Sequence, residues 1–168
     1  MKELQLDALD SPIGTVLIVV DDERLCALDF ADCEQRMMTL LQRRYGPVHL
    51  IQTTNPAGFS SRIHAYFAGD YQSLDSIPIS IGGTDFQQQV WTALRTIRPG
   101  TTTSYRELAA KLEKPTAYRA VGAANALNPI GIVLPCHRVI GADASLTGYA
   151  GGLARKQWLL QHEGVLLC

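Results

Sequence analysis

The sequence lacks the features that mark membrane, secreted and disordered proteins. No stretch of the 168 residues approaches the roughly 18 consecutive apolar residues that a membrane-spanning helix needs. Residues 1–4 contain neither the apolar core nor the small-residue cleavage site of a signal peptide. Because 46% of the residues are apolar and 18% are charged, the composition is globular. These features predict a soluble, cytoplasmic protein with no membrane contact and with one domain or two small ones.

Cysteine is also scarce, which excludes a disulfide scaffold and disfavours a zinc site. The cysteines are scattered, so in a reducing compartment they should be free thiols: Cys26, Cys33, Cys136 and Cys168. Zinc needs several ligands at suitable spacing, whereas Cys26 and Cys33 are seven positions apart. The histidines that could join them stand alone: His49, His64 and His162. We therefore expect no metal and no cofactor.

Neither sign of charge dominates the chain, whose net charge is −1, but the two halves differ. Residues 1–83 contain 6 Lys/Arg and 11 Asp/Glu, and residues 84–168 contain 9 Lys/Arg and 5 Asp/Glu. A basic second half is typical of a protein that meets an anion such as nucleic acid. The indication is weak by itself, since ordinary enzymes show similar differences.

The first half has the pattern of a small α/β domain. Three segments alternate or are rich in β-branched residues, which predicts an antiparallel meander: residues 4–9, 14–20 and 25–30. Residues 11–14, Ser-Pro-Ile-Gly, predict a turn between the first two. Two segments have an apolar helical face, residues 33–45 and 59–67. Residues 74–81 are either a strand or a linker.

Gly82-Gly83 is the candidate boundary, dividing the chain into residues 1–82 and 83–168. Helix starts follow it at two capping boxes, Thr84 to Gln87 and Ser104 to Glu107. A further helix is predicted over residues 117–127. A short break joins the helix that starts at Ser104 to the helix over residues 117–127. The two helices fit either a helix-turn-helix or a plain helical hairpin.

The helix over residues 117–127 is unusual because small residues dominate it and Arg119 is its one charged residue. Small side chains allow close approach of a backbone. The partner is either another helix or a nucleic-acid groove, and the pattern alone leaves both open.

Residues 128–141 are the most informative stretch. The apolar residues 130–134 predict a buried strand or extended segment, which Pro135 ends just before Cys136. Cys136 is either a small core residue or a nucleophile whose thiol pKa is lowered by His137 and Arg138. Neighbours in an extended chain point to opposite sides, so direct pairing of Cys136 with His137 needs a turn, and otherwise a bridging water.

The sequence Pro135-Cys-His-Arg-Val139 resembles the active-site motif of the O6-alkylguanine-DNA alkyltransferases, also called methylated-DNA–protein-cysteine methyltransferases. The rest of the second half is similar to this family in order and spacing. The matching segments are residues 86–91, 104–105, 119–122, 128–129, 149–152 and 162–164. The resemblance implies an α+β protein, with a ribonuclease H-like α/β domain before a mostly helical domain that contains a helix-turn-helix.

The resemblance also implies an activity, direct-reversal DNA repair. Such a protein flips O6-alkylguanine, and also O4-alkylthymine, out of duplex DNA. It transfers the alkyl group irreversibly to its own cysteine, so that each molecule reacts once. The implied partner is double-stranded DNA, approached through the minor groove by a monomer.

Site residues are implied position by position. Cys136 matches the alkyl acceptor, His137 the base that acts on it through a water, and Glu163 the partner of that histidine. Asn128 matches a residue that braces the active-site turn, and Tyr105 one that rotates the phosphate and donates a proton to the leaving guanine. Arg119 matches the arginine that replaces the flipped base, on a helix whose small residues fit the groove: Ala120, Gly122 and Ala126.

The expected substrate pocket includes the carbonyl groups of Cys136 and Val139 and the ring of Tyr149. Two positions depart from other family members. Ala150 replaces a serine whose backbone N–H contacts O6, so alanine should keep that contact. Gly131 replaces a proline that walls the pocket, which makes the range of substrates less certain than the reaction.

Three other functions compete with this interpretation. A non-enzymatic lesion-binding relative lacks the reactive cysteine, and Cys136 argues against it. A transcription regulator needs an effector or dimerisation segment, for which 168 residues show no pattern. A Cys–His hydrolase would turn over an ester or amide.

Overall fold

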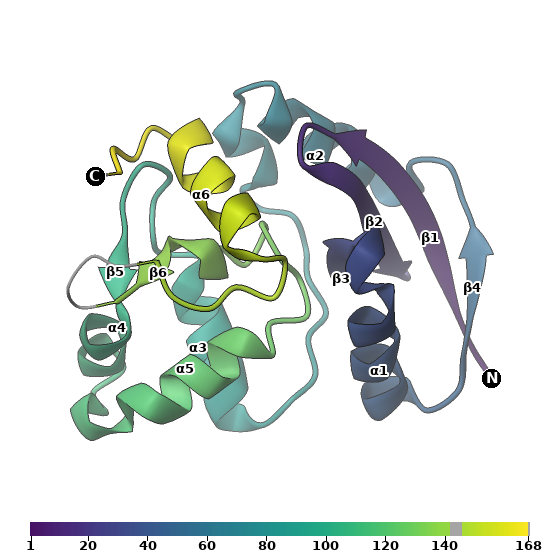
Figure 1. Ribbon diagram of the computed structural model, residues 1–168. Coiled ribbons are helices and arrows are strands. Elements are labelled where there is room, and N and C mark those ends of the chain that lie inside the picture. Colours follow the sequence, from purple (N-terminus) through teal and green to yellow (C-terminus); the bar gives the residue numbers. More distant parts are fainter. Residues whose placement is uncertain (142–145, 168) are drawn as a thin grey trace. The chain divides into compact units, whose positions relative to one another are not determined.

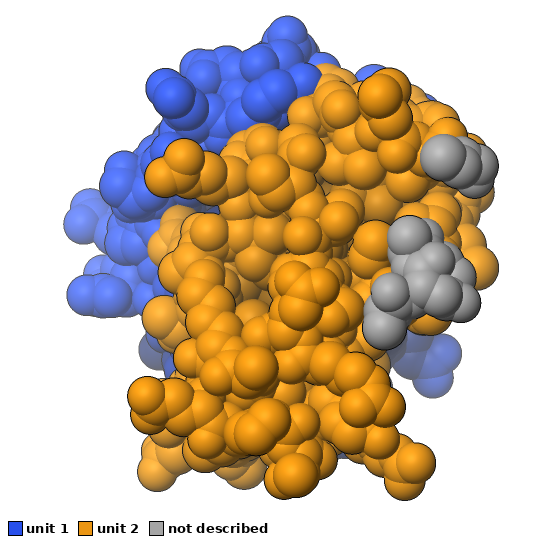
Figure 2. All heavy atoms as spheres, turned by 90° about the vertical axis from the view of Figure 1, so that its left-hand side faces the viewer, with its two compact units in different colours: residues 1–82, 129–133 blue, residues 83–128, 134–168 orange. Residues whose placement is uncertain are grey.

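The computed structural model describes residues 1–141 and 146–167 and divides into two compact units (Figures 1 and 2). The first unit contains residues 1–82 together with 129–133, and the second contains 83–128 and 134–168. A single boundary at Gly82-Gly83 does not account for residues 129–133, which belong to the first unit. No described helix is both long and apolar enough to cross a membrane.

A four-stranded sheet in the order β3-β2-β1-β4 forms the first unit. Antiparallel pairing of β1 (Lys2–Ser11), β2 (Gly14–Asp21) and β3 (Arg24–Phe30) confirms the predicted meander. The edge strand β4 (Val48–Gln52) runs parallel to β1 and was not predicted. Its five residues include two polar ones and are half-buried or exposed, so its apolar pattern is weak.

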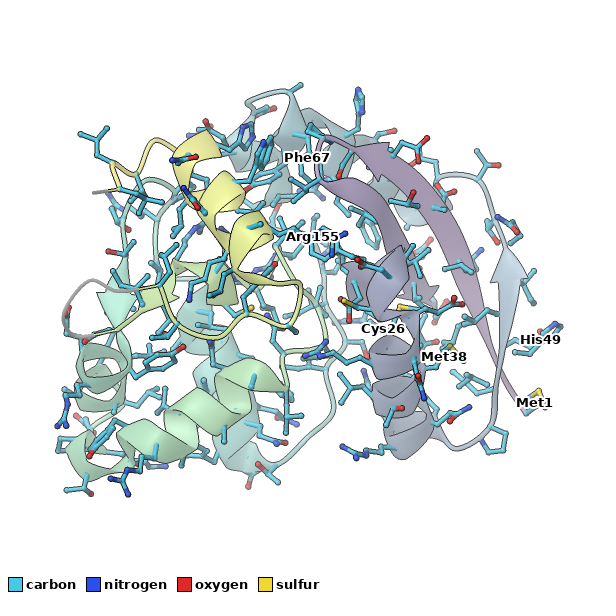
Figure 3. The ribbon with its side chains drawn as sticks, in the orientation of Figure 1. Met1, Cys26, Met38, His49, Phe67 and Arg155 are labelled. Atoms are coloured by element: carbon cyan, nitrogen blue, oxygen red, sulfur yellow. The ribbon has the colours of Figure 1, made fainter. Side chains whose placement is uncertain are left out.

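Helices α1 (Glu34–Tyr45) and α2 (Phe59–Phe67) complete the first unit, close to their predicted ranges. Met37 and Leu41 of α1 pack with Leu17 and Val19 of β2, and Cys26 and Met38 belong to the same layer (Figure 3). Ser60 of α2 is tied to β1, because its hydroxyl donates to Asp7 Oδ2 at 2.6 Å. Since β2 is buried at successive positions, the sheet is covered on both faces at this strand.

The free edge of β3 is capped by two single-residue bridges, from Ile79 to Leu25 and from Ile130 to Leu28. The Leu28 N–H donates to Pro129 O at 3.1 Å, and its carbonyl accepts from Gly131 N at 3.0 Å. Residues 74–81 are therefore mainly a linker, with one bridging residue and a 3-10 turn, Tyr71–Leu74, at its start. Capping removes part of an unpaired edge.

Four helices and one short strand pair make up the described second unit: α3 (Asp85–Leu94), α4 (Tyr105–Lys111), α5 (Tyr118–Ala126), α6 (Leu153–His162), β5 (Thr103–Ser104) and β6 (Val139–Ile140). The capping box at Thr84 and Gln87 is confirmed. At α4 the Ser104 hydroxyl accepts from Glu107 N, but the Glu107 carboxylate accepts from that same hydroxyl, not from a backbone N–H. The second box is therefore only half formed.

Helix α3 anchors the second unit with an apolar face. Val90, Trp91 and Leu94 are buried. Trp91 Nε1 donates to Ala124 O at 2.8 Å, so that α3 also holds α5. Helices α4 and α5 pack on each other, and a 3-10 turn at Pro115–Ala117 lies between them in the chain.

Gly83 gives a direct test of how α3 begins. Its φ is +84°, and a Cβ there would lie 2.6 Å from Gln87 Oε1 and 2.8 Å from the Trp91 ring. We expect Gly83→Ala to lower the free energy of unfolding by about 1–3 kcal/mol, measured by urea denaturation. Gly148→Ala is the matched control, since a Cβ there meets nothing within 4 Å. Equal stability of the two variants would show that the start of α3 moves at no cost.

Candidate active site

Cys136 lies at the start of a 3-10 turn, Cys136–Arg138, which supplies the turn that pairing with His137 requires. The expectation of a buried strand or extended segment over residues 130–134 is right about burial and wrong about conformation. The segment is buried but turned, because Ile132 adopts φ +69° and Val133 N donates to Gly131 O at 2.7 Å. Three-residue turns of this kind break a strand after one bridging residue.

Asn128 and Asn125 hold this turn from one side. Asn128 is 2% exposed, and its Nδ2 donates to Leu134 O at 2.7 Å, a carbonyl that also accepts from Cys136 N at 2.7 Å. Asn125 Nδ2 donates to Cys136 O at 3.5 Å, the long limit for a hydrogen bond. Asn128 thus bonds to the segment that leads into the cysteine turn, and its role in the site stays a prediction.

His137 and Glu163 meet in the interior of the second unit. His137 Nε2 lies 2.8 Å from Glu163 Oε2, and both side chains have no exposed surface. Glu163 follows the last residue of α6, where an exposed position near the chain end was the alternative. Its burial rules out that alternative.

Arg138 holds the same carboxylate from a second direction. Its Nε donates to Glu163 Oε1 at 2.8 Å and its Nη2 to Oε2 at 2.9 Å, while Nη1 donates to Ile97 O at 2.6 Å. A two-point guanidinium–carboxylate pair fixes orientation as well as charge. Arg138 therefore neutralises Glu163, a role that the sequence analysis did not assign to it.

The hydrogen bonds determine the state of the imidazole. Burial alone would raise the pKa of Glu163, but hydrogen bonds from Arg138 and His137 outweigh it and hold that pKa well below its usual range. Burial lowers the pKa of His137, so the imidazole is neutral at neutral pH. An ionised carboxylate only accepts, so Nε2 must carry the proton. Nδ1, which has no hydrogen-bond partner among the described residues, is left as the basic atom.

Lys156 is a second buried group that the sequence analysis missed. It is 0% exposed, and Nζ donates to Val139 O and to Thr147 O, each at 2.6 Å. Burial lowers its pKa to about 8, so the amine is still mostly protonated at neutral pH. The available signal was its spacing, because Lys156 and Glu163 share the helix face of Leu159 and Leu160.

Tyr105 is brought to the site by the pairing of β5 with β6. Ser104 pairs with Ile140, and Thr103 with Val139, which follows the cysteine turn directly. The half-buried Tyr105 ring lies beside Gly122 of α5, where an added Cβ would sit 3.7 Å from it. Tyr105 Oη accepts a hydrogen bond from Thr147 Oγ1 at 3.2 Å.

Helix α5 exposes its small residues. Ala120, Ala123 and Ala126 face outward with Arg119, whereas Val121 and Ala124 are buried. Within the described part of the chain, the exposure of these three alanines means that no helix covers them, whereas Gly122 and Ala124 of the same helix lie against α4 and α3. This face of α5 is exposed and carries only short side chains beside Arg119.

The expected pocket residues are described in part. Val139 is buried, Tyr149 half-buried and Ala150 exposed, all in the second unit. Gly131 belongs to the first unit, where its N–H donates to Leu28 O. Its role as a pocket wall stays a prediction.

The other cysteines and histidines are the candidate metal ligands of the sequence. Among residues 1–141 and 146–167, no three His, Cys, Asp or Glu side chains gather as metal ligands. Burial raises the pKa of the Cys26 thiol to about 12, which makes that thiol unreactive. Cys168 lies outside the described residues.

Comparisons with known proteins agree with this geometry. Residues 85–165 match the DNA-binding domain of 6-O-methylguanine DNA methyltransferase, and residues 7–81 match its ribonuclease-like domain. A methylated-DNA–protein-cysteine methyltransferase of Shigella flexneri is 46% identical over 170 residues and covers 99% of both chains. The chain belongs to this methyltransferase family.

Solved structures support the same assignment. The O6-methylguanine methyltransferase of Mycobacterium tuberculosis is 40% identical, covers 97% of this chain and 93% of its own, and has a TM-score of 0.79. The OGT protein of M. tuberculosis, crystallised in complex with DNA, is 39% identical over 96% of this chain and 92% of its own, also with a TM-score of 0.79. The methyltransferase thus has the predicted α+β fold with a ribonuclease-like first domain. Its activity is methylated-DNA–protein-cysteine methyl transfer, and its second unit is the DNA-binding domain of the family.

Glu163→Gln tests the buried ion pair. The substitution leaves the Arg138 guanidinium, which is 6% exposed, without a countercharge. We expect the free energy of unfolding to fall by about 3 kcal/mol, measured by urea denaturation. Glu113→Gln, at an exposed position of the same unit, should change it by less than about 0.5 kcal/mol. An equal effect of the two changes would contradict the pairing described here.

Proposed function

We propose that the methyltransferase takes an alkyl group from O6 of guanine, or from O4 of thymine, onto Sγ of its own Cys136. The single observation that carries the assignment is the hydrogen bond of His137 Nε2 to Glu163. It leaves Nδ1 as a base on the residue next to a cysteine. The other described cysteines have no such neighbour in sequence: Cys26 and Cys33.

The proton transfers balance in this scheme. The Cys136 thiol gives its proton through a water to His137 Nδ1, and the sulfur attacks the alkyl carbon. The bond between that carbon and O6 breaks, and the leaving guanine takes a proton from Tyr105. His137 then loses a proton to solvent and Tyr105 regains one. The thioether is not cleaved again, so each molecule reacts once.

The α4–α5 pair serves as a helix-turn-helix that enters the minor groove. Guanine O6 is unreachable inside a duplex, so the nucleotide must leave the stack. Arg119, exposed at the start of α5, fills the space left by the flipped base. The exposed stripe of Ala120, Ala123 and Ala126 lets the helix backbone approach the DNA, and Gly122 adds no side chain beside it. A monomer contains every part that this scheme needs.

The extruded base is received by groups around the cysteine turn. The carbonyls of Cys136 and Val139 accept its amino group, Tyr149 walls the pocket, and the backbone N–H of Ala150 contacts O6. Val139 O already accepts from Lys156, and a carbonyl has room for a second donor. Gly131, in place of a proline, leaves the pocket wall smaller.

The stoichiometry of transfer tests the proposal. We expect intact-mass spectrometry, after incubation with excess O6-methylguanine duplex, to show a gain of one methyl group per molecule, located on Cys136 by peptide mapping. Cys136→Ser should abolish the gain, because a hydroxyl is a much poorer nucleophile than a thiolate. Cys33→Ser is the matched control and should keep it. Continued turnover, and equally a methyl group on another residue, would overturn the assignment.

Base flipping predicts that Arg119→Ala slows reaction with duplex more than reaction with free O6-methylguanine. The arginine has a base to replace only in the duplex, and stacking of this kind is worth about 1–3 kcal/mol, or roughly 5- to 150-fold in rate. The ratio of the two transfer rates, measured for the variant and the unchanged protein, is the readout. An equal loss on both substrates would make Arg119 a structural residue.

A further inference from the structure

A chain of hydrogen bonds joins Lys156, Thr147 and Tyr105 within the second unit. Lys156 Nζ donates to the Thr147 carbonyl at 2.6 Å, and the Thr147 hydroxyl donates to Tyr105 Oη at 3.2 Å. The mechanism proposed above uses the phenol of Tyr105 but gives no part to Thr147. The effect of the Thr147 hydroxyl on the phenol of Tyr105 therefore remains to be explained.

The backbone of Thr147 is fixed relative to Tyr105 by a short path of bonds. Lys156 Nζ also donates to Val139 O at 2.6 Å, so one buried ammonium joins Thr147 to β6. Strand β6 pairs with β5, and Ser104 of β5 directly precedes Tyr105. Thr147 and Tyr105 are thereby both connected to the β5–β6 strand pair.

The direction of the contact matters for proton donation. A phenol has one proton and accepts through the lone pairs of its oxygen. When the Thr147 hydroxyl donates into that oxygen, the phenol proton stays available for the leaving base. As the proton departs, negative charge grows on Oη, and a hydrogen bond to a charged oxygen is about twice as strong as a neutral one. The bond is thus stronger in the transition state than before it.

We propose that Thr147 is a positioning residue for the proton transfer from Tyr105. Its hydroxyl orients the phenol O–H away from itself and toward the leaving guanine, and stabilises the phenolate that the transfer creates. The inference rests on the proton-donor role of Tyr105 in the proposed function. Thr147 itself contacts neither the sulfur nor the alkyl group in this scheme.

A double-mutant cycle tests the coupling, with single-turnover methyl transfer at saturating O6-methylguanine duplex as the measurement. Thr147→Val keeps the β-branched shape and removes the hydroxyl. We expect it to slow transfer about tenfold, the value of a hydrogen bond to a developing charge. Thr147→Ser restores the hydroxyl and should recover a rate within about threefold of the original.

The decisive comparison is made with Tyr105→Phe. Without a phenol, the Thr147 hydroxyl has no oxygen to act on, so Thr147→Val should slow transfer by less than about twofold in that background. A purely structural role would give the same fractional loss with and without the phenol. An equal fractional loss in the two backgrounds would overturn the inference. So would an undiminished rate for Thr147→Val, and so would an undiminished rate for Tyr105→Phe.

A second readout separates this effect from damage to the cysteine site. Iodoacetamide alkylates Cys136 without a guanine leaving group, so Thr147→Val should leave that rate unchanged while methyl transfer slows. A parallel loss in both reactions would show a disturbed cysteine turn and overturn the inference. If the unchanged protein gains no methyl group on Cys136 from the duplex, the proposed function itself fails. If it does gain one and the cycle shows no coupling, only the role of Thr147 fails.

Discussion

The carboxylate of Glu163 is the constraint on which the rest of the site depends. Its two oxygens receive three N–H groups, one from His137 and two from Arg138, in a region with almost no exposed surface. Arg138 supplies the positive charge that keeps Glu163 ionised, so the histidine does not have to. The imidazole can then stay neutral and keep a lone pair on Nδ1. A buried ion pair here sets a tautomer more than it adds stability.

A two-residue strand pair carries the second geometric constraint. The β5–β6 ladder contains only two residue pairs, yet it sets the first turn of α4 next to the residues that follow the cysteine turn. Tyr105 and Cys136 are 31 positions apart in the sequence. Neither strand is long enough to form alone, so this proximity depends on the helices that flank it and on Lys156, which bonds to Val139.

Much of the local structure follows from the sequence, because it depends on neighbouring residues. The capping box at Thr84 and the apolar face of α3 are local patterns, and the structure has both. The conformation of residues 130–134 could not be predicted in this way. Their apolar composition predicts burial, but not the left-handed backbone of Ile132 that turns the chain. The short strands β4, β5 and β6 carry too few residues for a periodic signal.

The candidate site divides in the same way. Cys136, His137 and Arg138 are adjacent in sequence, so their proximity does not depend on the fold. Glu163 lies 26 positions from His137, and only the resemblance to a family indicated that the two residues pair. Lys156 and Thr147 had no motif to mark them, and their importance comes from what their polar atoms meet in the folded chain. Sequence gives the chemistry of single residues, and tertiary packing decides which of them act together.

The segment that leads to Cys136 completes the sheet of the other unit, through the bridge between Leu28 and Ile130. The chain thus leaves the first unit at Gly82, returns to it for residues 129–133 and departs again. A protein cut once at Gly82 would strand Ile130 and Ile132, which are 0% and 1% exposed, and would unpair both backbone groups of Leu28. The two units alternate along the chain, so neither can be moved intact into another protein by a fusion at a single point.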